Sequence, residues 1–164
     1  MMNAAVKKKP AVKITRVSSK KQLTQAFAIR IRVFVKEQKV AAEIELDGDD
    51  RRAVHFLALA SGKAVGTARL VLDHGRAKIG RMAVLKSYRR KGVGTRLLKR
   101  AIGAAKRLRA QQIYLHAQVP VIGFYERAGF QSVGRIFNEA GIAHRKMILR
   151  SVNERSKDAN RRQP

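Results

Sequence analysis

The hydrophobic pattern of this chain changes at Gly92 from short strand-like runs to helical spacing, and no other feature constrains its fold as strongly. Before Gly92, apolar segments at 54–60, 65–72 and 78–85 are separated only by short turn sequences, Ser-Gly-Lys and Asp-His-Gly. This pattern predicts three successive hairpin strands. After Gly92, apolar residues recur every three or four positions, which predicts a helix. The apolar stripe of this helix consists of Val93, Leu97, Leu98, Ala101, Ile102, Ala105 and Leu108.

The flanking segments extend this order at both ends. Residues 12–17 predict a strand, and Ser18 or Ser19 can cap the helix that follows. The apolar positions of that helix are Leu23, Phe27, Ile31, Phe34 and Val35, and a polar connection follows. Four elements are predicted after the long helix: a strand at 113–116, a short helix at 119–128, and a hairpin at 130–137 and 143–149. The whole order predicts an α+β layer sandwich.

The length and the ends of the chain predict one domain with two tails. A chain of 164 residues can bury its own core as a single domain. Residues 1–11 and 151–164 are polar and charged without an apolar period, so we expect mobile tails around a folded unit at 12–150. The chain contains no cysteine, which excludes disulfides and favours a cytoplasmic protein. No segment approaches the roughly 20 apolar residues of a membrane helix, so we expect neither membrane insertion nor export.

The net charge of +26 is the most unusual bulk property. A surface this positive attracts polyanions, so nucleic acid, ribosomes and phosphorylated cofactors are all candidate partners. The basic side of the long helix, from Lys91 to Arg109, lacks interleaved aromatic residues that would stack on bases. Lys and Arg are also usual on the solvent side of such a helix. We therefore expect at most a weak association with nucleic acid.

The segment from Tyr88 to Thr95 joins the third hairpin strand to the long helix, and its position suits a phosphate group. The first N–H groups of a helix have no intrahelical partner, and the helix dipole is positive there. Gly92 and Gly94 let the backbone approach a pyrophosphate without an intervening Cβ. The candidate binding residues are Arg89, Arg90, Lys91, Gly92, Val93, Gly94 and Thr95.

Two common phosphate-binding motifs do not fit this segment. It lacks the Gly-Lys-Ser/Thr ending of a Walker loop, and Leu97 stands where a dinucleotide fingerprint has its third glycine. From spacing alone, a glycine turn that merely begins a basic helix is an equal alternative.

The same segment resembles a known family. Residues 89–94 match the Arg/Gln-x-x-Gly-x-Gly/Ala pattern with which the GNAT N-acetyltransferase superfamily holds the pyrophosphate of acetyl-CoA. Residues 124–130, Phe-Tyr-Glu-Arg-Ala-Gly-Phe, resemble that superfamily's Phe/Leu-Tyr-Glu-x-x-Gly-Phe segment. The similarity covers roughly residues 12–150. Four further sites resemble the ElaA-like and YjcF-like branch: residues 32–38, 45–47, His55 and residues 115–118.

The resemblance implies a GNAT fold with three α/β/α layers and a mixed, mainly antiparallel sheet that is splayed between its fourth and fifth strands. Acetyl-CoA would lie in this splay, and an amine would attack its thioester directly in a ternary complex. The backbone of Met82, Ala83 and Val84 would bind the pantetheine, with the Val84 N–H near the thioester oxygen. Gln118 stands where the family often has an Asn that bonds the pantetheine, and Phe124 is a further cofactor-binding position.

Tyr125 is the best catalytic candidate. It occupies the family position whose phenol donates a hydrogen bond or a proton to the departing CoA sulfur. The alternative is a tyrosine that only packs by its ring.

The general base has two candidates. Six of the eleven acids lie between Glu37 and Asp50, where they could hold a cationic amine and take its proton, and we choose Glu45 among them. A solvated loop whose acids meet nearby Arg and Lys is an equal alternative. His116 ends a strand close to the expected splay, although a lone strand histidine is more often structural. Four scattered histidines and no cysteine predict no metal site.

These observations predict an acetyl-CoA-dependent N-acetyltransferase that acetylates a primary amine of a small molecule or a protein. The alternatives are a non-catalytic acyl-CoA sensor of the same fold, and a basic module that binds nucleic acid or ribosomes. We expect a monomer or a homodimer. The sequence does not identify the acceptor.

Overall fold

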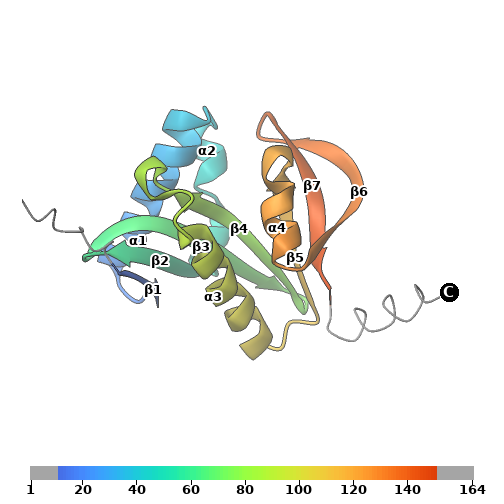
Figure 1. Cartoon of the computed structure of the whole chain (residues 1–164), viewed down its shortest axis with the longest axis horizontal. Helices are drawn as coiled ribbons and strands as arrows, with labels where there is room; N and C mark the ends of the chain where they lie inside the picture. Colours follow the sequence, from blue (N-terminus) through green and yellow to red (C-terminus); the bar gives the residue numbers. More distant parts are fainter. Residues whose placement is uncertain (1–10, 151–164) are drawn as a thin grey trace, which may run out of the picture.

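A computed structural model describes residues 11–150, so the predicted tails lie outside the described residues except for Ala11. One mixed sheet of seven strands has the order β1-β2-β3-β4-β5-β7-β6 (Figure 1). The strands are β1 (Val12–Arg16), β2 (Val54–Ala60), β3 (Lys63–Asp73), β4 (Arg76–Val84), β5 (Gln112–Gln118), β6 (Phe130–Glu139) and β7 (Ile142–Leu149). Neighbouring strands are antiparallel except β4 and β5, which are parallel. The predicted α+β class with a mainly antiparallel sheet is confirmed.

The central meander turns where the sequence predicts. Ser61 and Gly62 between β2 and β3 have φ angles of 48° and 77°, and His74 and Gly75 between β3 and β4 have φ angles of 44° and 75°. Two consecutive positive φ angles are the signature of the tight turn that matches the twist of a hairpin. The strands run slightly further than predicted because these turns hold only two residues.

Helices cover both faces of the sheet. They are α1 (Lys20–Arg30), α2 (Ala42–Glu45), α3 (Val93–Arg107) and α4 (Ile122–Arg127), and a π-helical turn, Ile31–Glu37, continues α1. Ala26 and Ile29 of α1 pack against Leu57 on one face. The buried side of α3 packs with Phe56 and Ile79 on the other face, and α3 crosses in front of the sheet in Figure 1. Alternation along the strands therefore produces the predicted three layers.

Two helical patterns differ from the prediction. The fully buried face of α1 includes Ala26, Ile29 and Arg30, whereas the predicted positions Leu23 and Phe27 are only half-buried. Arg30 takes a core position because acids from the following connection neutralise it. Leu108 was predicted on the buried stripe of α3 but is 46% exposed, because the helix ends one residue earlier. Ser19 caps α1 by accepting a hydrogen bond from the Gln22 N–H, as predicted.

The sheet splays between β4 and β5. These strands pair only from Arg76 beside Gln112 to Ile79 beside Leu115, while β4 runs on to Val84 and β5 to Gln118. A β-bulge in β4 accompanies the divergence: the register with β3 shifts, and Arg81 has a φ of 50°. This confirms the predicted splay between the fourth and fifth strands. Within the described residues, no helix is long and apolar enough to span a bilayer.

Candidate active site

The splay opens into a cleft of about 720 Å³. Its walls come from the end of β4, the start of α3, α4 and β5, together with the π-helical turn and the β6–β7 hairpin. The predicted residues that line it are Glu45, Met82, Ala83, Val84, Arg89, Arg90, Gly92, Gly94, Thr95, His116, Gln118, Phe124 and Tyr125. Lys91 and Val93 do not line it: the Lys91 amine donates to the Ser87 carbonyl at 2.6 Å, and Val93 is buried in the core.

The start of α3 presents free backbone donors to this cleft. Gly92 caps the helix with a φ of 78°, a conformation that favours glycine, and the Arg96 N–H makes the first helical hydrogen bond to the Gly92 carbonyl. The N–H groups of residues 93–95 therefore have no intrahelical partner. A Cβ on Gly94 would already touch the Phe124 ring at 3.5 Å, so any longer side chain would fill the space between α3 and α4. The site fits a pyrophosphate held by main-chain amides.

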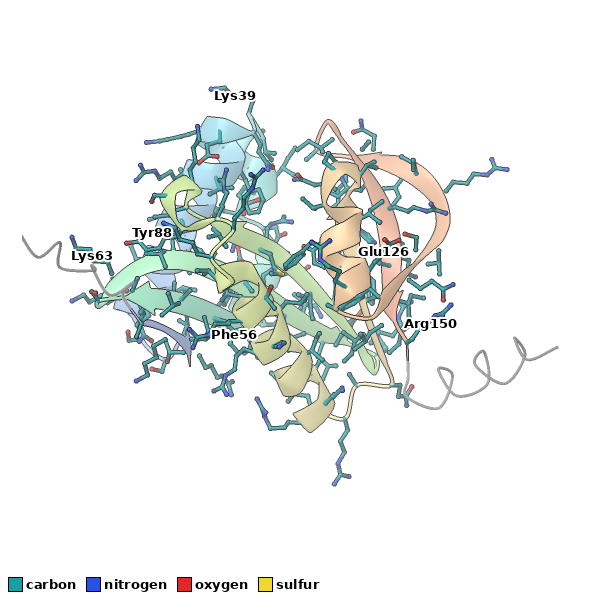
Figure 2. The ribbon with its side chains drawn as sticks, viewed as in Figure 1. Lys39, Phe56, Lys63, Tyr88, Glu126 and Arg150 are labelled. Carbon is teal, nitrogen blue, oxygen red and sulfur yellow. The ribbon has the colours of Figure 1, made fainter. Side chains whose placement is uncertain are left out.

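The basic side chains before α3 differ in what they contact. Arg89 Nε donates to the Val84 carbonyl at 2.8 Å, and its Nη2 donates to Glu37 at 2.7 Å. Arg89 thus ties the end of β4 to the π-helical turn. Arg90 is exposed at the edge of the cleft, where it can face an anion. Figure 2 shows Tyr88 in the same loop, and the ammonium of Lys91 lies 5.6 Å from the centre of its ring.

The Tyr125 hydroxyl points at a sulfur atom in the splay. It donates to Met82 Sδ at 3.8 Å, while its ring packs edge-on against Phe124 and Phe130. Burial raises the pKa of Tyr125 to about 12, so the phenol keeps its proton at neutral pH. The phenol therefore carries a proton that it can donate, and its acceptor in this structure is the thioether of Met82.

The side chain of Gln118 is hydrogen-bonded to Gln38. Its amide nitrogen donates to Gln38 at 2.8 Å, and the Gln38 nitrogen donates back at 3.3 Å. This pair bridges β5 to the end of the π-helical turn. A hydrogen bond from Gln118 to pantetheine therefore requires the pair with Gln38 to open.

The acids of the segment from Glu37 to Asp50 meet arginines, as the alternative to a catalytic cluster expects, but two of these acids are not solvated. Glu45 is 3% exposed, and Arg30 of α1 is completely buried beside it. Arg30 donates to Glu45 and to Asp50, each at 2.6 Å. The buried ion network as a whole consists of Arg30, Arg69 and Arg81 with Glu45, Asp47 and Asp50. Its three positive and three negative charges balance.

This network holds the bulge of β4. Arg81 Nε lies 3.1 Å from Glu45 Oε2, and Arg81 Nη2 donates to Asp47 at 2.9 Å and to the Ile44 carbonyl at 3.0 Å. Burial raises the pKa of Glu45, although the nearby arginines oppose that rise. Both carboxylate oxygens of Glu45 are thus occupied by guanidinium groups. Sequence reasoning did not predict that Arg30, Arg69 and Arg81 belong to this network. The one signal in the sequence was an arginine, Arg30, at a position of α1 that faces the core.

His116 forms a pair that sequence reasoning also missed. Its Nδ1 lies 2.7 Å from Glu139 Oε2, and its ring packs edge-on against Phe137 at 4.9 Å. The hydrogen bond from His116 holds the pKa of Glu139 at about 2, against the effect of burial, and Lys78 adds to the lowering. Because Glu139 is then a carboxylate, Nδ1 of His116 is the donor in this contact. Nε2 is left as the proton acceptor.

His55 lies outside the cleft lining. It is buried, its Nε2 lies 3.0 Å from the Asp50 carbonyl, and its Nδ1 has no partner among the described residues. Burial lowers the pKa of His55, so the ring stays neutral beside Arg30 and Arg69. These contacts give His55 a structural role next to the ion network.

Comparisons with known proteins agree with this geometry. The family model of the acetyltransferase (GNAT) domain matches residues 14–151. The uncharacterised N-acetyltransferase YjcF of Bacillus subtilis is 37% identical over 131 residues, which are 79% of this chain and 94% of that protein. The crystal structure of an acyl-CoA N-acyltransferase from Pseudomonas aeruginosa matches with a TM-score of 0.76 and 31% identity, over 85% of this chain and 100% of that one. The crystal structure of Escherichia coli ElaA matches with a TM-score of 0.77 and 26% identity, over 85% of this chain and 100% of that one. The predicted resemblance to ElaA and YjcF is confirmed, and the chain belongs to the GNAT acetyltransferase family.

Proposed function

We propose that this protein transfers an acetyl group from acetyl-CoA to a primary amine by direct attack within a ternary complex. The observation that carries the proposal is one cleft that holds both the free amides at the start of α3 and the Tyr125 hydroxyl. The first element suits a pyrophosphate, and the second suits a leaving thiolate. GNAT membership supports acyl-CoA as the donor.

The donor would be held mainly by backbone groups. The N–H groups of residues 93–95 would bind the pyrophosphate, and Arg90 would add charge. Beyond the last β4–β5 pair, the backbone of residues 82–84 faces no parallel neighbour and would bond the pantetheine. The Val84 N–H would then polarise the thioester carbonyl.

The contacts of the two candidate proton acceptors favour His116 over Glu45. His116 lines the cleft and contacts Glu139 through Nδ1 rather than Nε2, while the carboxylate of Glu45 is bound by Arg30 and Arg81. His116 would accept a proton from the ammonium, and the resulting amine would attack the carbonyl carbon. The C–S bond then breaks, and Tyr125 would give its proton to the sulfur, so that CoA leaves as a thiol. The nitrogen of the new amide would pass its extra proton to the Tyr125 oxygen, and His116 would release its proton to solvent.

Release of free CoA, with acetylated amine detected by mass spectrometry, tests this proposal directly. A panel of primary amines should include at least one acceptor whose acetylation consumes acetyl-CoA in equal amount. Stoichiometric acetyl-CoA binding without turnover on any amine would instead favour an acyl-CoA sensor. Steeply salt-dependent RNA binding without affinity for CoA would favour the nucleic-acid module.

A further inference from the structure

The face of the sheet opposite α3 brings Lys78 and His116 together. Lys78 of β4 pairs in register with Tyr114 of β5, and His116 follows on the same face two residues later. Both side chains line the cleft. Lys78 is also close enough to Glu139, the partner of His116, to lower the pKa of that carboxyl. Lys78, His116 and Glu139 therefore form one cluster beside the splay.

The acids that line the cleft already have hydrogen-bond or ion-pair partners. Glu45 is bound by Arg30 and Arg81, and Glu139 is bound by His116. The arginines that line this side, Arg69 and Arg81, are likewise paired with acids. A second positive charge on an acceptor would therefore meet no carboxylate without a partner among the residues that line the cleft.

Lys78 differs from the charged residues around it. It is half-buried at the cleft, and no hydrogen bond or ion pair within 4 Å joins it to another described residue. Val71, its partner on β3, is apolar and also lines the cleft, as does Ile142. A half-buried ammonium beside apolar walls attracts an anionic group more strongly than one in open water.

We propose that the acceptor is an amine that also carries a carboxylate. The carboxylate would lie beside Lys78, and the amine would face Nε2 of His116 toward the splay. This inference rests on the proposed acetyl transfer and narrows its acceptor to small amino carboxylates. It also disfavours polyamines, which the chain's net charge of +26 repels.

The test compares acceptors that differ only in charge. The full chain is assayed for CoA release with γ-aminobutyrate, its amide and putrescine, and with glycine, leucine and phenylalanine beside their amides. Rates are divided by the fraction of unprotonated amine. We expect at least one amino carboxylate to have a kcat/KM about tenfold or more above its amide and above putrescine, as one ion pair in a partly desolvated site can provide.

Variants of Lys78 test whether this side chain causes the preference for amino carboxylates. Lys78→Met keeps the aliphatic stem, so it should raise KM for the preferred carboxylate about tenfold more than KM for its amide. Lys78→Arg should restore the preference. Lys63→Met removes the same charge from the β2–β3 turn, far from the cleft lining (Figure 2), and should change neither acceptor. Two results would overturn this inference while leaving acetyl transfer intact. One is a kcat/KM for the amides or putrescine as high as that for every amino carboxylate, and the other is an equal loss of kcat/KM for the carboxylate and its amide in Lys78→Met. Absence of CoA release with every amine would instead contradict the proposed function.

Discussion

Nδ1 of His116 lies 2.7 Å from Glu139 Oε2, and this contact joins β5 to the end of β6 across the intervening β7. It fixes the orientation of the imidazole at the point where β4 and β5 separate. It also sets the tautomer, because the carboxylate requires a proton on Nδ1. The pair therefore orients the histidine that we propose as the proton acceptor.

Replacing His116 should lower kcat far more than replacing Glu139. We expect His116→Gln to lower kcat by about 10²-fold or more, the usual range for a general base. Glu139→Gln should lower kcat by about tenfold, because the imidazole loses the carboxylate that orients it. Steady-state rates from pH 5 to 9 measure both effects. An unchanged kcat in His116→Gln, together with a large loss in Glu45→Gln, would transfer the role to Glu45.

Tyr125→Phe should separate chemistry from binding. The variant keeps the ring contacts with Phe124 and Phe130 but loses the hydroxyl directed at Met82. We expect kcat to fall by roughly 10²-fold while the Kd for acetyl-CoA stays nearly the same. Tyr114→Phe, on a tyrosine outside the cleft lining, is the matched control. Full turnover in Tyr125→Phe would remove the phenol from the mechanism.

The buried ion network should matter more to stability than other charges nearby. Glu45→Gln leaves Arg30 buried with one acid fewer, so the free energy of unfolding should fall by about 3–5 kcal/mol. Asp49→Asn breaks an exposed pair with Arg52 and should cost less than about 1 kcal/mol. Urea denaturation of both variants measures the contrast. Similar losses in the two would show that the network contributes no more than a surface pair.

The Glu139 carboxyl should make the fold sensitive to acid. Its pKa is about 2 in the folded protein against an ordinary value of 4.5, so its stabilising effect is complete above pH 4.5 and is lost as the pH falls toward 2. Asp47 and Asp50 add to this loss. Burial alone would raise their pKa values, but a hydrogen bond from Arg69 to Asp47, and hydrogen bonds from Arg30 and Arg69 to Asp50, lower them. Urea unfolding between pH 5 and 2 should show a shallower decline for Glu139→Gln than for the unaltered chain. Equal slopes would mean that the His116 contact does not persist in solution.

The order of elements and the donor side of the site were predictable from sequence because they depend on local signals. The change of period at Gly92 marks a helix start that also carries the predicted phosphate site, and two motifs on neighbouring elements indicated the family. The splay followed from that resemblance. The cytoplasmic location, the oligomeric state and the tails stay predictions.

The acceptor side was not predictable because it depends on long-range contacts. Arg30 is buried by acids 15 and 20 residues further along the chain, and His116 pairs with a residue 23 positions away. The apolar periodicity of the sequence predicted that large apolar residues form the buried face of α1. Such a pattern cannot show that the charge of Arg30 is neutralised in the core. The same limit made Glu45 look like a free carboxylate.

The central claim is that main-chain amides at the start of α3 hold acetyl-CoA. Calorimetric titration with acetyl-CoA tests it in three proteins: the unaltered chain, Gly94→Glu, and Gly103→Glu, which adds the same side chain further along α3 and away from the cleft lining. We expect one equivalent of acetyl-CoA to bind the unaltered chain and Gly103→Glu, and none to bind Gly94→Glu. Undiminished binding by a folded Gly94→Glu would contradict the account.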